Sequence, residues 1–189
     1  VAVMASRCIN ILANLWHTPE KGDSKSGALG IGSSEACMLG GVAAWLRWRK
    51  RREAEGKPTD KPNLVMSSGM QVVWEKFCQL WQIELRQVPL TNENRTLSAR
   101  EALKHCDENT ICIVPIAGVT WTGLNDDIEA LNHELDAYNK MTGYDIPIHV
   151  DAASGGFILP FIDPDCKWDF RLKWVKSIST SGHKYGLVY

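Results

Sequence analysis

A lysine near the end of the sequence stands where its amine could act as a nucleophile. Lys184 lies between Gly182 and Gly186 and follows a β-like run over residues 175–179. A lysine just past a strand can enter a binding pocket, because ligands of parallel sheets bind beyond the carboxyl ends of the strands. Desolvation there favours the neutral, nucleophilic form of an amine, which can attack a carbonyl group. Taken alone, the pattern also fits an ordinary surface lysine.

An aspartate earlier in the chain stands in a similar position. Asp151 follows a strand candidate over residues 146–150 and precedes the small residues Ala-Ala-Ser-Gly-Gly. Because the carboxyl ends of parallel strands meet at one edge of a sheet, Asp151 and Lys184 can reach the same crevice. Together they suggest a cofactor site.

A glycine-rich segment that opens a long helical pattern could hold a phosphate group. Residues 27–32 contain three glycines and precede Ser33 and Ser34. Backbone N–H groups at a helix N-terminus bind phosphate dianions, and the two hydroxyls could assist. The alternative is a simple N-cap, with either serine as the cap and Glu35 in the first turn. A P-loop is excluded because no Gly-Lys-Ser/Thr follows.

Hydrophobic periodicity places these residues in an alternation of helices and strands. Ser98 with Glu101 predicts a capping box, and Asp126 or Asp127 can cap a later helix. Residues 18–26 are predicted to form a loop, and no helix is predicted between the last two strands. The predicted helices are 5–16, 33–55, 71–82, 98–106 and about 126–138, and the predicted strands are 63–66, 83–90, 110–118, 146–150 and 175–179.

This order predicts an α/β layered domain with a largely parallel sheet. Thr120, Asp151 and Lys184 each follow a strand, and so does the loop that leads to Gln71. We therefore expect these four side chains to gather at one edge of the sheet.

The composition is that of an ordinary globular protein. Of the 189 residues, 44% are apolar and 23% are charged, and the formal net charge is −1. This balance gives no electrostatic reason to expect nucleic acid or a membrane surface as a partner. The basic run over residues 47–52 ends a predicted helix, where cations complement the helix dipole. No apolar run is long enough to cross a bilayer, which takes about 18 residues.

Six cysteines form no CxxC pair and have no metal-ligand spacing with the five histidines. We therefore expect no metal site. Most of the cysteines lie in apolar surroundings, as buried thiols do. This usage fits a reducing compartment, so we expect a cytoplasmic location.

The ends of the sequence suggest a piece of a longer protein. The chain starts at Val1 inside a helical pattern and stops at Tyr189, shortly after Lys184. We expect residues 1–189 to be part of a cofactor-binding large domain, without its N-terminal segment and without a C-terminal small domain.

A phosphate cradle, a strand-end aspartate and a strand-end lysine are the groups that pyridoxal 5′-phosphate requires. The lysine binds the cofactor covalently as a Schiff base, and the aspartate keeps the pyridine nitrogen protonated so that the ring can accept electrons. A Rossmann-type nucleotide site using residues 27–34 is the alternative. It lacks a Gly-x-Gly-x-x-Gly match and leaves Lys184 unexplained.

Several separate motifs resemble one family of enzymes. Residues 31–41 (IGSSEACMLGG), 149–157 (HVDAASGGF) and 177–186 (SISTSGHKYG), together with 47–65 and 118–123, are similar to glutamate decarboxylases of the bacterial, plant and fungal type. These are group II pyridoxal-phosphate decarboxylases. The resemblance runs the whole length and implies fold type I, the aspartate aminotransferase-like large domain, with a mixed, mostly parallel sheet and helices on both faces.

The resemblance also implies roles for individual residues. Lys184 would be the covalent lysine and Asp151 the partner of the ring nitrogen, with His183 as a third catalytic residue. Ala153 would pack on one face of the ring and Gln71 on the other, where many related decarboxylases carry histidine. The full set of implied cofactor contacts is Ser33, Ser34, Gln71, Thr120, Asp151, Ala153, Ser181, His183 and Lys184. Ser33 and Ser34 would bind the phosphate, with Ser181 and His183 close to it, and Thr120 would contact the ring substituents.

The implied reaction is α-decarboxylation of L-glutamate to γ-aminobutyrate and CO₂. The rival interpretations are another fold type I enzyme, such as a different amino-acid decarboxylase or a sphingosine-phosphate-lyase-like enzyme, and a non-catalytic homologue. The resemblance further implies a homodimer or larger homo-oligomer with the site at the subunit interface. Calmodulin would be a partner only if a plant-type C-terminal tail exists.

Overall fold

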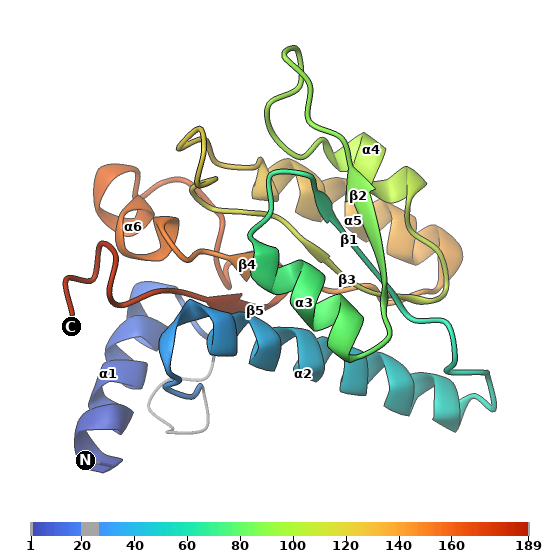
Figure 1. The fold of residues 1–189 in the computed structure, drawn as a ribbon, viewed down its shortest axis with the longest axis horizontal. Coiled ribbons are helices and arrows are strands. Elements are labelled where there is room, and N and C mark those ends of the chain that lie inside the picture. The colour runs from blue at the N-terminus through green and yellow to red at the C-terminus, as the bar shows by residue number, and fades with distance from the viewer. Residues whose placement is uncertain (1, 20–26, 189) are drawn as a thin grey trace.

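A five-stranded parallel sheet forms the centre of the protein (Figure 1). The computed structural model describes residues 2–19 and 27–188. The strand order is β2-β1-β3-β4-β5, and every pairing among the described strands is parallel. The strands are β1 (Asn63–Ser67), β2 (Glu84–Val88), β3 (Thr110–Val114), β4 (Ile148–Asp151) and β5 (Val175–Ser179). The five predicted strands are thus confirmed, with β3 ending before Pro115.

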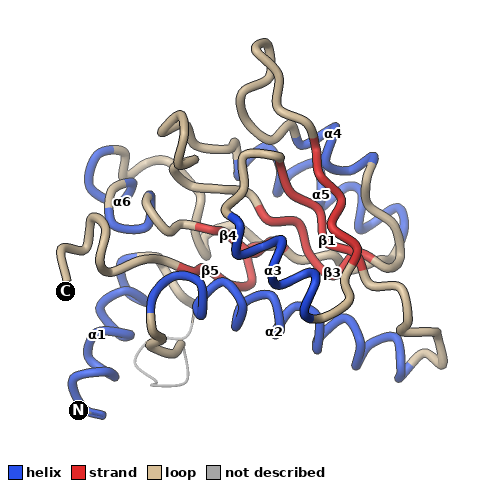
Figure 2. Tube along the Cα trace, viewed as in Figure 1, coloured by secondary structure: helices blue, strands red, loops and turns tan. Residues whose placement is uncertain are grey.

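Helices cover both faces of the sheet, as predicted (Figures 1 and 2). Buried side chains of α2 and α3 form one hydrophobic cluster with β1 and β3, whereas those of α4 and α5 pack in a second cluster on the other face. No helix in the described part of the chain is long and apolar enough to cross a membrane. The helices are α1 (Ala2–Leu15), α2 (Gly32–Ala54), α3 (Val72–Leu80), α4 (Ala99–Lys104), α5 (Ile128–Thr142) and α6 (Leu159–Ile162).

Strand β4 presents different chemistry to the two faces because side chains alternate along a strand. Ile148 and Val150 belong to the cluster on the side of α5. His149 and Asp151 point to the opposite face, where both reach Trp74 of α3. The polar groups of β4 are therefore placed beneath α2 and α3.

The connection from β4 to β5 contains two short helical segments that the sequence pattern did not reveal. A 3₁₀ turn, η2 (Gly155–Phe157), leads into α6, which carries Pro160 in its first turn. Parallel neighbours need a crossover connection, and proline is tolerated in a first turn because its missing N–H would be unpaired there. The prediction of no helix between these strands was wrong.

The predicted helix caps are partly confirmed. Asp127 caps α5 by accepting a hydrogen bond from its first turn, whereas Asp126 is buried and accepts two backbone N–H groups from outside the helix. Ser98 caps α4 by accepting from the Glu101 N–H. The Glu101 carboxylate pairs with Lys104 instead of completing the capping box.

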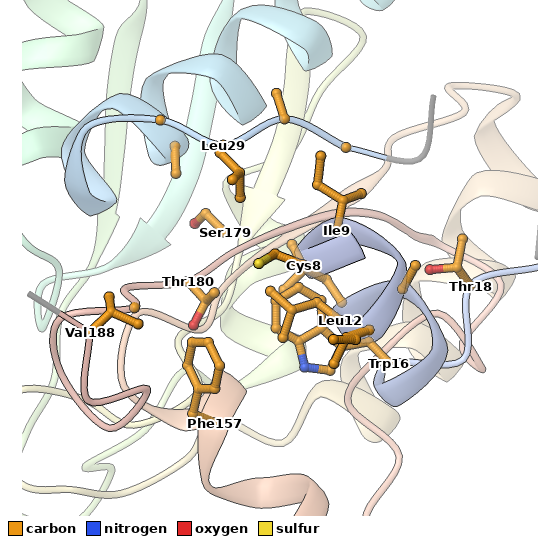
Figure 3. Close-up of a pocket in the computed structure, with 18 of the residues that line it drawn as sticks. Cys8, Ile9, Leu12, Trp16, Thr18, Leu29, Phe157, Ser179, Thr180 and Val188 are labelled. Carbon is orange, nitrogen blue, oxygen red and sulfur yellow. The ribbon is translucent and has the colours of Figure 1, made fainter. Parts of the chain in front are cut away.

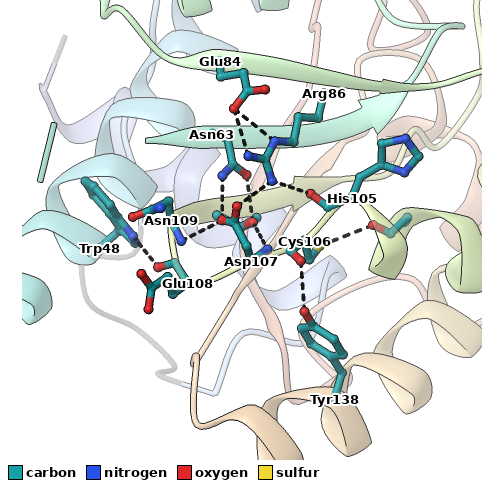
Figure 4. Close-up of polar contacts among 12 residues, drawn as sticks. Trp48, Asn63, Glu84, Arg86, His105, Cys106, Asp107, Glu108, Asn109 and Tyr138 are labelled. Atoms are coloured by element: carbon teal, nitrogen blue, oxygen red, sulfur yellow. Dashed lines mark hydrogen bonds and ion pairs between the residues drawn. The ribbon is translucent and has the colours of Figure 1, made fainter. Parts of the chain in front are cut away.

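A polar network ties the amino ends of three strands together (Figure 4). The Asp107 carboxylate accepts hydrogen bonds from Asn63 Nδ2, Arg86 Nη1 and the Asn109 N–H, each at 2.8 Å. Thr110 Oγ1 donates to Asn63 Oδ1 at 2.7 Å. Because Asn63 and Thr110 begin β1 and β3, this network lies at the edge of the sheet opposite to the strand ends that carry Asp151.

The arginine side chains at the end of α2 contact other residues of the same chain. Arg47 and Arg51 both pair with Asp145, and the guanidinium of the buried Arg52 stacks over Trp48. The interpretation of this run as the end of a helix is confirmed, since α2 extends to Ala54.

Two adjacent glycines let α2 approach the sheet closely. A Cβ atom added at Gly40 would overlap the ring of His149, and one added at Gly41 would lie 2.6 Å from the ring of Phe77. Interiors are packed too densely to absorb such an overlap without backbone movement. The pair therefore sets the spacing of α2 from β4 and α3.

Replacing Gly41 by alanine should destabilise the full-length protein by about 1–3 kcal/mol through overpacking. This sign is informative, because alanine at an unconstrained helix position stabilises by roughly 1 kcal/mol relative to glycine. Thermal unfolding of the cofactor-free protein measures the effect. Leu39→Ala, at an exposed position of the same helix, is the control and should stay within about 0.5 kcal/mol. An unchanged or higher unfolding temperature for Gly41→Ala would contradict the packing argument.

Candidate functional site

The Asp151 carboxylate is buried and held by hydrogen bonds from three directions. Its exposed fraction is 2%. Oδ2 accepts from Trp74 Nε1 at 2.8 Å and faces the thiol of Cys37 at 3.7 Å. Oδ1 accepts from the backbone N–H of Ala153 at 3.2 Å. The prediction that Asp151 ends a strand is confirmed, and α3, α2 and the chain after β4 each contribute one donor.

The loop after β5 brings Lys184 to the same place. Ser181 N–H donates to the Ala153 carbonyl, and Lys184 N–H donates to the Ser181 carbonyl. Lys184 is half-buried. Burial and the charge of Asp151 raise the pKa of the Cys37 thiol, which lies beside that carboxylate.

Ser181 itself carries an unusual group. Its exposed fraction is 1%, and its Oγ has no hydrogen-bond partner among the residues that the structure describes. A buried hydroxyl without a partner costs free energy, which makes it a candidate contact for a ligand oxygen.

The N-terminus of α2 lies against this loop. Helix α2 starts at Gly32 with Ile31 in the N-cap position, and no side chain caps it through Ser33 or Ser34. The alternative N-cap interpretation of the two serines was therefore wrong. A Cβ atom on Gly32 would lie 3.8 Å from Cε1 of His183, which places the histidine ring beside the first turn of the helix.

Glu35 lies in the first turn of α2, as the alternative interpretation expected. Its carboxylate reaches back and accepts a hydrogen bond from the Ile31 N–H. The hydroxyls of Ser33 and Ser34 thus do not cap the helix. The Glu35 carboxylate instead accepts a backbone hydrogen bond at this helix end.

Gln71 and Thr120 meet at the adjacent strand ends. Gln71 occupies the N-cap position of α3 but makes no cap bond with its side chain. Its Nε2 instead donates to Thr120 Oγ1 at 2.9 Å. The convergence of these two predicted residues is therefore seen directly.

A cavity of about 530 Å³ borders the site (Figure 3). Helix α1, the segment before α2 and the loop after β5 enclose it, with apolar side chains such as Leu12, Leu29 and Phe157. Gly32 and His183 belong to both the cavity and the site, whereas Asp151 and Lys184 do not line it. Its apolar walls suit hydrocarbon rather than a charged ligand, so the candidate site lies beside this cavity.

Comparison with known proteins assigns the family. The pyridoxal-dependent decarboxylase conserved domain matches residues 1–189. The chain belongs to this family. A glutamate decarboxylase beta from Listeria monocytogenes is 56% identical over 190 residues, covering 100% of this chain and 41% of the relative. The chain thus spans about two fifths of the length of that curated relative.

Solved structures share the fold of this chain. A glutamate decarboxylase from Lactobacillus brevis superposes with a TM-score of 0.93 at 49% identity, over 100% of this chain and 43% of that one. A sphingosine-1-phosphate lyase from Burkholderia pseudomallei gives 0.81 at 26% identity, over 98% of this chain and 42% of that one. The predicted fold class, fold type I, is confirmed.

Sequence reasoning missed two residues of this candidate site. Trp74 and Cys37 were not among the predicted site residues, yet both contact the Asp151 carboxylate. Spacing held a clue, because Trp74 follows Gln71 by three positions and Cys37 follows Ser34 by three. Residues three apart lie on one face of a helix.

His149 is linked to Asp151 indirectly, through Ser179 and Cys37. Its ring nitrogens meet Ser177 Oγ at 2.7 Å and Ser179 Oγ at 3.1 Å. Ser179 Oγ in turn lies 3.3 Å from Cys37 Sγ. Burial lowers the pKa of His149 to about 3, so the ring is neutral at physiological pH.

Proposed function

We propose that the full-length protein is a pyridoxal-phosphate-dependent decarboxylase that converts L-glutamate to γ-aminobutyrate and CO₂. The observation that carries the proposal is the meeting of a buried carboxylate, Asp151, with the loop that holds Lys184, next to the N-terminus of α2. The relatives support the substrate, because two that are 56% and 49% identical to this chain over the matched region are named glutamate decarboxylases.

The residues present fit pyridoxal phosphate. The unpartnered Oγ of Ser181, the hydroxyls of Ser33 and Ser34 and the N–H groups that open α2 form a set of donors suited to a phosphate dianion. His183 lies beside that helix end. The Asp151 carboxylate suits a protonated ring nitrogen. We therefore assign the phosphate to the α2 end of the site and the ring nitrogen to the β4 end.

The remaining contacts would hold the cofactor ring from both of its faces. Ala153, whose backbone is fixed between Asp151 and Ser181, would pack on one face. Gln71 would cover the other face, with its amide steadied by Thr120, which would also contact the ring substituents. When bound, the cofactor supplies an electron-accepting ring for the electron pair of the Cα–carboxylate bond that breaks.

The protein groups have separate tasks in this reaction. Lys184 would hold the cofactor covalently through its amine. Asp151 keeps a proton on the ring nitrogen by placing a negative charge beside it, a preorganised electrostatic contribution. Positioning by the pocket aligns the bond to be broken, and a proton then returns to Cα as CO₂ leaves.

The proposal also includes the oligomeric state of the protein and its cellular location. Residues 1–189 would form part of a large domain whose site is finished by a second copy in a homodimer or larger oligomer. Trp121 and Leu187, near the site, are 82% and 88% exposed, as side chains at an interface are in an isolated subunit. Calmodulin would bind only through a plant-type tail. The free cysteines support a cytoplasmic location.

Removing the lysine tests the chemistry. The full-length protein with pyridoxal phosphate should show a visible absorption band, and borohydride should attach the cofactor permanently to the peptide that contains Lys184. Lys184→Ala should lose this attachment, detected by mass spectrometry, and should form no γ-aminobutyrate. Lys176→Ala, on the exposed edge of β5, is the control and should behave like the wild type. Attachment at another lysine would refute the assignment.

The products identify the substrate. Incubation with glutamate, aspartate and tyrosine should give γ-aminobutyrate from glutamate as the sole amine. Another amine as the main product would support the rival amino-acid decarboxylase. A protein that takes up the cofactor without releasing CO₂ from any of them would support the non-catalytic homologue.

A substitution at Ser181 tests the proposed contact with the phosphate group. Ser181→Ala should weaken the binding of pyridoxal phosphate by about 10- to 100-fold, the value of a hydrogen bond to a charged group, while the binding of pyridoxal, which lacks the phosphate, changes little. The cofactor-free protein should unfold no earlier than the wild type, because the hydroxyl has no partner to lose. Equilibrium dialysis measures both affinities, with Ser6→Ala in α1 as the control. An equal loss for both ligands would contradict the phosphate contact.

A further inference from the structure

The donors around Asp151 share a property that the proposed reaction can use: none of them is a cation. The indole N–H of Trp74, the thiol of Cys37 and the backbone N–H of Ala153 are the groups that contact the carboxylate. In the part of the chain that the structure describes, Asp151 forms no ion pair. The negative charge is therefore held in place without being compensated.

The next layer of residues is also neutral. Burial and the charge of Asp151 both raise the pKa of the Cys37 thiol, so it stays protonated. Burial lowers the pKa of His149 to about 3, which keeps its ring uncharged. Ser179 connects the two, with its Oγ 3.3 Å from Cys37 Sγ and 3.1 Å from His149 Nε2. Hydrogen bonds thus orient the thiol, and the described groups that contact Asp151 from this side are neutral.

The helices hold this network rigidly. The ring of His149 packs edge-on to Trp74, with centroids 5.3 Å apart, and Gly40 leaves room for it beneath α2. Trp74 packs in turn against Phe77 at 6.0 Å. The indole N–H is consequently fixed in direction, and so is the Oδ2 atom to which it donates.

We propose that Trp74 and Cys37 are positioning residues that fix Asp151 with neutral donors and so leave its full negative charge for the ring nitrogen of the cofactor. This inference rests on the proposed cofactor site. A cationic partner in their place would share the carboxylate and weaken its hold on the ring proton. A carboxylate with no donors could not remain ionised while buried. Neutral donors are the arrangement that satisfies both requirements.

The test changes the donor and the acceptor separately. Trp74→Phe keeps an aromatic ring against Phe77 and His149 but removes the N–H. The full-length variant and the wild type are each titrated with pyridoxal phosphate and with its deaza analogue, in which carbon replaces the ring nitrogen. Equilibrium dialysis gives the four affinities, and γ-aminobutyrate formation is measured alongside.

With pyridoxal phosphate, Trp74→Phe should lose about 10- to 100-fold in affinity, since a hydrogen bond to a buried charge is removed. With the deaza analogue, variant and wild type should bind within about twofold of each other, because there is no ring proton for Asp151 to hold. Trp48→Phe is the matched control: it loses an indole N–H bond of 3.1 Å to the Glu108 carbonyl, in the same hydrophobic cluster but away from Asp151. It should change neither affinity.

A second pair of variants covers the case in which Trp74→Phe does not fold. Cys37→Ser keeps a neutral donor and should retain most of the affinity, whereas Cys37→Ala should show the same cofactor-dependent loss to a smaller degree. Equal losses with both cofactors, or none with either, would overturn the positioning role. A wild type that binds neither cofactor would instead refute the proposed function, which keeps the two failures distinct.

Discussion

One buried charge constrains much of this structure. An ionised carboxylate taken out of water costs several kcal/mol unless donors surround it. Asp151 finds its donors on α3, on α2 and at the start of the chain that follows β4. Each of these elements must therefore sit correctly for the others to be useful. The packing of α2 and α3 on this face of the sheet and the ionisation of Asp151 therefore depend on each other.

The close approach of α2 to the sheet allows a donor from this helix to reach Asp151. Gly40 and Gly41 remove the side chains that would keep the helix away from His149 and Phe77. The approach carries Cys37 to Asp151 and, at the start of the same helix, brings Gly32 beside His183. A glycine pair in the middle of a helix lowers its intrinsic stability. The glycine pair is present because α2 must lie close to β4. The same short distance places Cys37 beside Asp151 and Gly32 beside His183.

Local patterns were sufficient for the strands and for the residues at their ends. The position of Asp151 could be predicted because an apolar run before a polar residue marks the carboxyl end of a buried strand. Lys184 could be placed because it follows the β-like run over residues 175–179. The role of Trp74 could not be predicted, because its indole N–H reaches Asp151 across the packing of α3 on β4, a contact between distant parts of the chain. Helix α6 was missed for a different reason: four residues give too short a period to recognise, and Pro160 argues against a helix unless it falls in the first turn.

The two edges of the sheet differ in how completely their polar groups are paired, and the difference explains where a ligand can bind. At the amino edge Asp107 has three donors, and the Asn63 and Thr110 side chains are bonded to each other. At the carboxyl edge the hydroxyl of Ser181 is buried without a partner. An unpaired buried hydroxyl costs about 1–3 kcal/mol, which a ligand oxygen would return on binding. Among the described residues, Ser181 thus leaves an unpaired donor at the carboxyl edge, and the proposed phosphate would accept a hydrogen bond from it.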